Sequence, residues 1–252
     1  MSTWNPELYL KFRQQRTQPS IDLANRVKKY APKTAIDIGC GPGNSTAVLR
    51  GAFPEARIMG IDSSTEMIAQ AWKNYPDMAF TVADAREIPG QYDLLFSNAC
   101  LQWIPDHETL IPGLMEHVAP GGCLAVQMPM NLDEPFYRVI DEVSRERDWG
   151  FDGSEQEHNT TLTPEEYYDI LAGCTKSFDA WETVYYHRMP DCESMIEWVR
   201  SARLRPYLNA LTPEAGEAFT ARILKETNKL YRPMADGNVL FRFRRFFFIG
   251  ER

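Results

Sequence analysis

The segment 34–45, TAIDIGCGPGNS, constrains the fold of this chain more than any other. A short apolar run that contains Asp37 breaks into three glycines at alternate positions, Gly39, Gly41 and Gly43, and residues typical of a helix start follow. Glycine permits a sharp turn and a close approach to a ligand, and a following helix presents unpaired N–H groups. The segment predicts a strand, a glycine loop and a helix that bind a nucleotide-type cofactor. The alternative is a tight strand-to-helix turn that binds nothing.

The spacing of the glycines argues against a dinucleotide. The dinucleotide fingerprint is G-x-G-x-x-G, and its third position falls on Asn44 counted from Gly39, or on Thr46 counted from Gly41. The phosphate loop also fails, because no lysine follows the glycines. A nicotinamide-dependent oxidoreductase is therefore a weakened rival.

Strands and helices alternate after the glycine loop, which predicts an α/β fold with a parallel sheet. The expected strands span 57–61, 79–82, 92–96 and 123–128. Ligands of such sheets bind at the carboxyl ends of the strands, where Asp62, Asp84 and Asn98 fall. Four strand ends, rather than one loop, thus favour a cofactor site.

The pattern D-x-G-x-G-x-G resembles the first motif of class I S-adenosylmethionine-dependent methyltransferases, and the resemblance covers residues 30–130. It implies S-adenosylmethionine as cofactor. It also implies a Rossmann-like, seven-stranded, mostly parallel sheet with an antiparallel last strand, helices on both faces and helical lid insertions. Residues 1–252 would form one methyltransferase domain, with the cofactor-binding core at 30–130 and lid or substrate-binding elements at 1–20, 131–180 and 190–238.

Each predicted strand end suits one part of this cofactor. A carboxylate at Asp62 can accept both ribose hydroxyls, and Asp84 with the N–H of Ala85 suits the edge of adenine. Asn98 and the backbone at Gly39 would receive the amino-acid group. Other cofactor candidates are Gly41, Ser63, Met67, Arg16 and Tyr9, of which the last two would form a flap. The competing interpretations are a helix cap at Asp62, a solvated carboxylate at Asp84 and simple packing of Tyr9.

Further stretches, which the general fold does not require, resemble the branch of this family that methyl-esterifies small polycarboxylates. They are residues 96–103, 127–131, 204–208 and 236–241, together with Trp4, Pro6, Tyr9, Phe12, Arg16 and Pro19. The implied partner is a small polycarboxylate. Arg203 departs from the expected small residue.

The predicted acid-binding arginines are Arg205, Arg242 and Arg245, because guanidinium forks bind carboxylates bidentately. Trp103 and Tyr207 would shape the pocket, with Trp103 as a wall. The strand 239–249 alternates, so Arg242 and Arg245 lie on opposite faces, which conflicts with one shared pocket. Each arginine could instead be a solvated edge charge.

No acid–base residue pair is evident, and an ionised carboxylate, with a pKa of ~4, needs none. The predicted catalysis is therefore positioning, with no catalytic acid or base assigned. Another acid, a hydroxyl or an amine as acceptor, and a non-catalytic cofactor-binding module, remain alternatives.

Composition narrows the setting. The formal net charge of −8 disfavours a nucleic-acid partner, and no apolar run approaches the ~20 residues of a membrane span. Five cysteines without a C-x-x-C pair, and an N-terminus unlike a secretory signal, favour the cytoplasm and no metal site. Monomer and homodimer stay open.

The N-terminal region predicts one helix from Asn5 and a second over 21–30. Beyond Met130, helices are expected at 135–149, 194–202 and 213–231, and strands at 183–189 and 239–249. A capping box at 163–166 predicts the start of a further helix.

Overall fold

The computed structural model describes residues 13–153, 155, 160–200 and 202–252. The chain divides into two compact units. The sheet unit comprises Arg16–Pro129, Asn159–Thr183 and Arg245–Arg252, and the helical unit comprises Met1–Gln15, Met130–His158 and Val184–Arg244.

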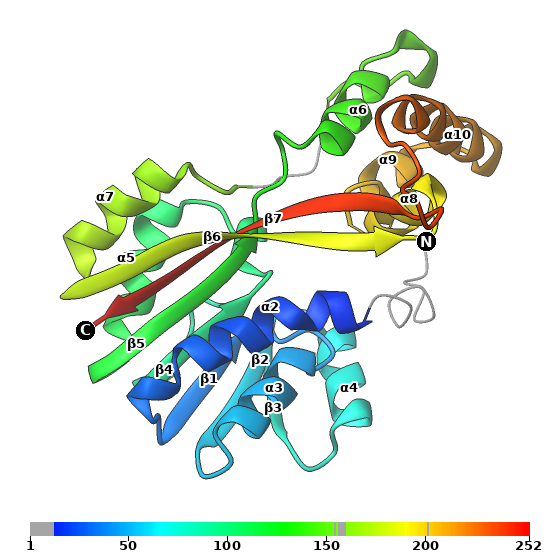
Figure 1. The fold of residues 1–252 in the computed structure, drawn as a ribbon. Coiled ribbons are helices and arrows are strands. Elements are labelled where there is room, and N and C mark those ends of the chain that lie inside the picture. Colours follow the sequence, from blue (N-terminus) through cyan, green and yellow to red (C-terminus); the bar gives the residue numbers. More distant parts are fainter. Residues whose placement is uncertain (1–12, 154, 156–159, 201) are drawn as a thin grey trace. The chain divides into compact units, whose positions relative to one another are not determined.

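A seven-stranded sheet has the order β3-β2-β1-β4-β5-β7-β6, and Figure 1 shows its strands. The strands are β1 (Thr34–Ile38), β2 (Arg57–Asp62), β3 (Ala79–Val82), β4 (Tyr92–Asn98), β5 (Val118–Pro129), β6 (Ser177–Met189) and β7 (Val239–Glu251). The first five pair in parallel, and β7 pairs antiparallel with β5. The predicted mixed sheet with its antiparallel last strand is confirmed.

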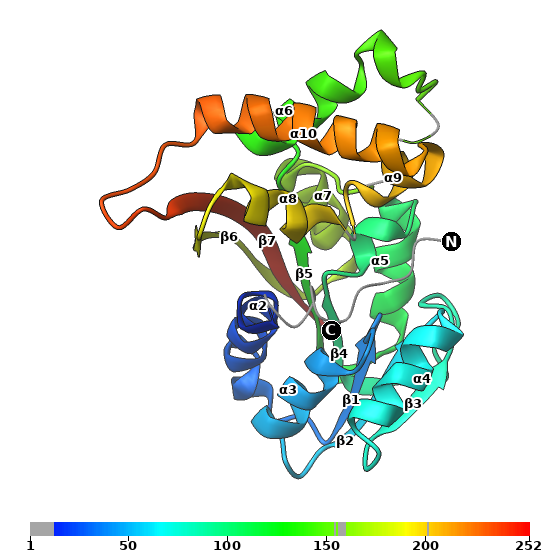
Figure 2. The ribbon, with the colours of Figure 1, turned by 90° about the vertical axis from the view of Figure 1, so that its right-hand side faces the viewer.

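Helices cover both faces of the sheet unit, as a parallel sheet with buried faces requires. Figure 2 shows α2 and α3 on one side of β1 and β4, and α5 on the other. Helix α4 packs on the same side as α3, because its Ile68 and Ala71 share a hydrophobic cluster with Ala47. The helices and 3-10 turns of this unit are α2 (Arg13–Arg26), η1 (Lys28–Tyr30), α3 (Asn44–Ala52), α4 (Thr65–Asn74), η2 (Leu101–Trp103), α5 (His107–Glu116) and α7 (Pro164–Cys174). The capping box at the start of α7 is confirmed, because the Thr163 hydroxyl accepts the Glu166 N–H and the Glu166 carboxylate accepts the Thr163 N–H.

Several predicted boundaries were wrong. The strand expected at 183–189, for example, is β6, which begins at Ser177. A helix was expected to start at 21, but α2 runs through Pro19 without a break, because an interior proline removes one backbone hydrogen bond and need not end a helix. The predicted start at Asn5 lies outside the described residues. Strand β5 begins at Val118 rather than at Cys123. The register between β4 and β5 shifts between these two residues, and residues 119–122 form the resulting bulge.

The helical unit has its own hydrophobic core. Its helices and 3-10 turn are α6 (Pro135–Ser144), η3 (Arg147–Trp149), α8 (Cys192–Arg200), α9 (Arg205–Ala210) and α10 (Pro213–Leu230). The core combines the apolar faces of α6, α8 and α10 with the helical-unit end of β7, through residues such as Ile140, Ile196, Phe219 and Phe241. The short helix α9, which opens at Arg205-Pro206, was not predicted, because six residues carry too little periodicity.

Candidate active site

The glycine loop joins β1 to α3 and adopts a left-handed backbone at all three glycines. A Cβ on Gly39 (φ +69°) would lie 2.1 Å from the Sγ of Cys100, so the loop and the residues after β4 pack against each other at this point. A Cβ on Gly41 (φ +52°) would meet no atom of the described residues within 4 Å. Gly39 is therefore required by packing, whereas the backbone at Gly41 borders open space.

Asp37 is a buried carboxylate at the base of the glycine loop. Its Oδ2 accepts hydrogen bonds from the hydroxyls of Ser45 and Thr46, each at 2.6 Å. Burial raises the pKa of Asp37 to about 6, and the two hydroxyl bonds oppose that shift. Its Oδ1 is buried and has no hydrogen-bond partner among the described residues. A largely ionised group therefore sits under the loop at neutral pH.

Asp62 at the end of β2 ties the glycine loop to the next helix. Its Oδ2 accepts the N–H of Gly41 at 3.0 Å, and its Oδ1 accepts the N–H of Ser64 at 2.9 Å. The cap of α4 is Ser64, whose hydroxyl accepts the N–H of Met67 at 3.2 Å, and Ser63 is exposed. Each oxygen of Asp62 keeps a lone pair for a further donor. The hydrogen bonds of Asp62 to the backbone are thus compatible with its predicted role of accepting the ribose hydroxyls.

Asp84 and Ala85 follow β3. The carboxylate of Asp84 is exposed and accepts the N–H of Arg86 at 2.8 Å, while Ala85 is buried. The backbone N–H of Ala83 bonds to the carbonyl of Asp62 at 3.1 Å, which holds the ends of β2 and β3 together. The structure therefore brings the predicted residues of both strands to one edge of the sheet.

Asn98 ends β4, and a turn leads from it into η2. The Asn98 Oδ1 is buried and, within the described parts of the chain, has no hydrogen-bond partner. Ala99 has a left-handed backbone (φ +55°), and Trp103 is 46% exposed. The predicted Asn98 thus offers an unsatisfied acceptor beside the glycine loop.

Two residues that sequence reasoning missed hold the turn after β4. The Nε2 of His107 donates to the carbonyl of Leu101 at 2.9 Å, so its Nδ1 accepts from the Tyr167 hydroxyl at 2.6 Å. The Thr160 hydroxyl donates to the carbonyl of Ile104 at 2.8 Å. The contacts of His107 with Tyr167 and of Thr160 with Ile104 span 60 and 56 residues of sequence, so no local pattern predicts them.

Nearby thiols are poor nucleophiles. Burial raises the pKa of the Cys100 thiol to about 12 and raises the pKa of the Cys40 thiol still further. Within the described residues, no group of three or more His, Cys, Asp or Glu is placed to hold a metal ion. The site therefore offers binding groups rather than a nucleophile.

The remaining predicted residues of the sheet unit lie on α2 and β7. Arg16 is half-buried in α2, and Tyr9 lies outside the described residues. Arg245 is 5% exposed, and its Nη1 donates to the Oε1 of Gln127 at 3.2 Å. Gln127 is fully buried in β5. It lies in the stretch 127–131, which carries part of the family resemblance, but it was not among the predicted site residues. A polar residue in the apolar run 123–128 is the signal that could have singled it out.

The other predicted acid-binding residues belong to the helical unit. Arg205 is exposed at the start of α9, and Arg242 forms an ion pair with the buried Glu134. Tyr207 is 1% exposed and packs against Phe151 and Phe219, and its hydroxyl has no partner in the described chain.

Arg203, the residue that departs from the expected small side chain, is buried in the helical unit and pairs with Asp141 on α6. Its charge is matched within the unit, where the ion pair links Arg203 to α6.

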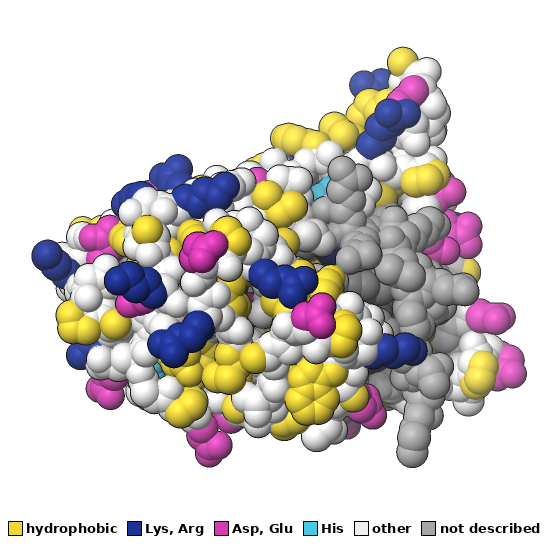
Figure 3. Space-filling model, turned by 90° about the horizontal axis from the view of Figure 1, so that it is seen from below, with side chains coloured by type: hydrophobic (Ala, Val, Ile, Leu, Met, Phe, Trp, Pro, Cys, Tyr) yellow, Lys and Arg dark blue, Asp and Glu magenta, His cyan; other side chains and the backbone are white. Residues whose placement is uncertain are grey.

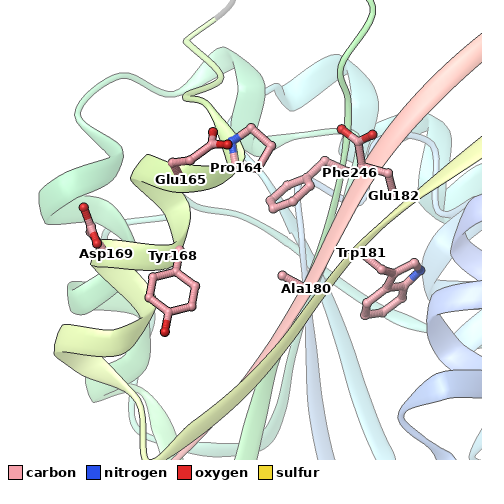
Figure 4. Close-up of a pocket in the computed structure, with 8 residues that line it drawn as sticks. All are labelled: Pro164, Glu165, Tyr168, Asp169, Ala180, Trp181, Glu182 and Phe246. Atoms are coloured by element: carbon pink, nitrogen blue, oxygen red, sulfur yellow. The ribbon is translucent and has the colours of Figure 1, made fainter.

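A pocket of about 680 Å³ lies between α7 and β6 in the sheet unit, shown in Figure 4. Phe246 projects into it, whereas Arg245, the preceding residue, projects from the opposite face of β7. None of the predicted site residues lines this pocket. The pocket is therefore separate from the open space beside Gly41.

Surface charge is mixed. On the described part of the face shown in Figure 3, basic and acidic side chains are interspersed rather than gathered by sign. No helix in the part of the chain that the structure describes is long and apolar enough to cross a membrane.

The space beside Gly41, the free lone pairs of Asp62 and the unsatisfied oxygen of Asn98 fit S-adenosylmethionine, which carries a ribose diol and an ammonium group. Residues 35–122 match the family model described as "Methyltransferase domain". Fold and site together define an S-adenosylmethionine-dependent methyltransferase of class I.

Full-length relatives narrow the class. The chain is 42% identical over 258 residues to the trans-aconitate 2-methyltransferase of Methylobacterium radiotolerans, and 40% identical over 257 residues to that of Yersinia pseudotuberculosis. Both comparisons cover 100% of this chain and 99% of the relative. The chain belongs to the trans-aconitate 2-methyltransferase family. The crystal structure of the YcgJ protein from Bacillus subtilis shares the fold, with a TM-score of 0.59, 12% identity, and coverage of 93% of this chain and 99% of that one.

Proposed function

We propose that this enzyme transfers a methyl group from S-adenosylmethionine to one carboxylate of a small polycarboxylic acid, trans-aconitate, and so forms a monomethyl ester. The full-length identity to relatives of that name supports the acceptor. The observation that carries the proposal is the unsatisfied, buried oxygen of Asn98 at the end of β4, together with the free lone pairs of Asp62, because these acceptors suit the ammonium and ribose groups of the methyl donor.

The chemistry asks little of the protein beyond positioning. S-adenosylmethionine, when bound, supplies a methyl group on a positively charged sulfur. The acceptor carboxylate is ionised near neutral pH, since its pKa is ~4, so no side chain must remove a proton. Holding the reacting oxygen in line with the methyl group, and excluding water, are the tasks that remain.

We assign the methyl-donor side to the strand ends of the sheet unit. Asp62 would accept the ribose hydroxyls, and the oxygen of Asn98 would accept from the ammonium group. Ala85 and Asp84 would meet the adenine edge, and the open space beside Gly41 would leave room for the donor. Arg16 would contribute from α2, and Trp103 would form a wall of the acceptor site.

The acid-binding roles of Arg205, Tyr207 and Arg242, and with them a substrate-binding role for the helical unit, are part of this proposal. Arg242 already has the carboxylate of Glu134 as partner, so it would have to exchange that partner or share it. Arg205 is exposed, so its guanidinium is the more accessible of the two to donate hydrogen bonds to a substrate carboxylate. We also propose a reducing cytoplasmic setting, which the five free cysteines support.

Arg205→Lys is expected to raise the KM for the acid about 10-fold, because lysine keeps the charge but loses the bidentate fork. The affinity for S-adenosylhomocysteine should stay within about twofold of the wild type. Steady-state kinetics and calorimetry measure the two quantities. Arg200→Lys, an exposed position of α8 in the same unit, is the matched control, and an unchanged KM in Arg205→Lys would remove Arg205 from the site.

A panel of mono-, di- and tricarboxylates with labelled methyl donor tests the proposal as a whole. Methylation of trans-aconitate at a kcat/KM at least about 10-fold above that of a monocarboxylate is the expected result. Donor binding with no acid methylated would favour the non-catalytic module, and preference for a long acyl chain would favour another acceptor.

A further inference from the structure

Gln127 is a carboxamide buried in the middle of the sheet unit. It lies on β5 between Val126 and Met128, and its side chain is 0% exposed. Its Oε1 accepts the hydrogen bond from Arg245 described above, but its Nε2 has no partner among the residues that the structure describes. An amide nitrogen that is buried without an acceptor is costly, so such a group points to a ligand or an ordered water.

The strand register places Gln127 next to Asn98. The two residues are direct partners in the parallel pairing of β4 and β5, so their side chains leave the same face of the sheet from neighbouring strands about 4.8 Å apart. One offers an unsatisfied nitrogen and the other an unsatisfied oxygen. Donor and acceptor therefore stand side by side at the carboxyl end of the sheet.

Arg245 completes this group from β7. It pairs with Pro129, two residues beyond Gln127 on β5, and its guanidinium reaches back to the Gln127 oxygen. A carboxamide oxygen that accepts one N–H of the fork restricts the rotation of the guanidinium. A guanidinium whose orientation is restricted in this way loses less entropy when it binds a carboxylate.

The three groups differ in whether they donate or accept hydrogen bonds, and this difference indicates which of the two ligands each one binds. The oxygen of Asn98 can only accept, which suits the ammonium of the methyl donor. The nitrogen of Gln127 and the guanidinium of Arg245 can only donate, which suits a carboxylate. Since the strands are adjacent, an acid held by Gln127 and Arg245 lies next to the donor.

We propose that Gln127 determines the specificity for the acid: its oxygen orients the Arg245 guanidinium, and its nitrogen donates directly to a carboxylate of the acceptor. This inference rests on the proposed function, because it concerns the same acceptor site. It adds a neutral, fully buried residue to a site so far assigned to arginines and aromatic residues.

Gln127→Met tests the inference, because methionine keeps the volume and removes both polar atoms. The KM for trans-aconitate is expected to rise about 10- to 100-fold, the range expected for a lost hydrogen bond to a charged group. The Kd of S-adenosylhomocysteine, measured by calorimetry, should stay within about threefold. Gln127→Glu should raise the KM more than about 100-fold, because the new carboxylate pairs with Arg245 and repels the acid.

Gln91→Glu is the matched control, since it makes the same charge change on an exposed side chain before the amino end of β4. Arg245→Lys is a second, independent variant, and it should raise the KM with unchanged affinity for S-adenosylhomocysteine. An unchanged KM in Gln127→Met, or a KM and a Kd that rise together, would overturn the inference. If the wild type methylates no polycarboxylate, the proposed function fails before any variant is compared.

Discussion

Gly41→Ala is expected to weaken the binding of S-adenosylhomocysteine at least about 100-fold, while thermal unfolding changes little. A Cβ at this position meets no atom within 4 Å in the part of the chain that the structure describes, so there the variant bears only the strain of a left-handed backbone, roughly 1 kcal/mol. The same Cβ would occupy the space that we assign to the methyl donor. Calorimetry with S-adenosylhomocysteine and a thermal unfolding scan separate the two effects.

Gly121→Ala is the matched control in the same unit. Its backbone is also left-handed (φ +81°), and its Cβ would likewise meet no described residue within 4 Å, but it lies near the amino end of β5. It should show the same small loss of stability with full donor affinity. Normal donor binding in Gly41→Ala would remove the loop from the donor site.

Gly39→Ala should behave in the opposite way and destabilise the protein by more than about 3 kcal/mol, because its Cβ collides with both the Sγ and the Cβ of Cys100. Cys100→Ala cannot relieve the clash with the Cβ, whereas Cys100→Gly can. The double variant Gly39→Ala/Cys100→Gly should therefore recover part of the lost stability. Urea unfolding of the wild type, the single variants Gly39→Ala and Cys100→Gly, and the double variant would show this.

Asp37→Asn is expected to gain stability relative to the wild type as the pH rises from about 4 to about 7. The folded pKa of Asp37, about 6, lies above its unfolded value of 3.8, so its contribution is fully present below pH 3.8 and is lost as the pH rises through 6. Asparagine does not ionise, so the difference between the variant and the wild type should grow by about 3 kcal/mol over that window. Urea unfolding at a series of pH values, without cofactor, measures it.

Asp93→Asn provides a control of the opposite sign. Asp93 accepts the N–H groups of Lys33 and Thr34, and these bonds hold its pKa below the ordinary value against the opposing effect of burial. Its contribution to stability is therefore present above its unfolded pKa and is lost as the pH falls. A pH-independent difference for Asp37→Asn would contradict the role of burial at that carboxylate.

The arrangement of the residues that we assign to the donor site could be predicted because it depends on local order along the chain. Each of Asp62, Asp84 and Asn98 follows an apolar run, and parallel strands bring their carboxyl ends to one edge. A residue's own neighbours in sequence are then enough to place it. The same local rule explains why β3 was predicted with its bounds.

Partners that come from distant segments could not be predicted. Glu134 occupies Arg242 across 108 residues, and Asp141 occupies Arg203 across 62. Gln127 meets Arg245 only because β7 lies beside β5, and Tyr167 and Thr160 reach His107 and Ile104 across 60 and 56 residues. The residue pattern and spacing along the sequence do not indicate which distant residues will pair.

The arginines of β7 show where the two sources of information part. Alternation along a strand already places Arg242 and Arg244 on one face and Arg245 on the other, because successive side chains point in opposite directions. Which face buries its arginine depends on what packs there. Tertiary structure surrounds Arg245 with β5 and supplies an amide as its partner, while Arg242 meets a carboxylate. Backbone geometry is local and follows from the sequence, but the solvation and charge around a side chain depend on segments that only folding brings together.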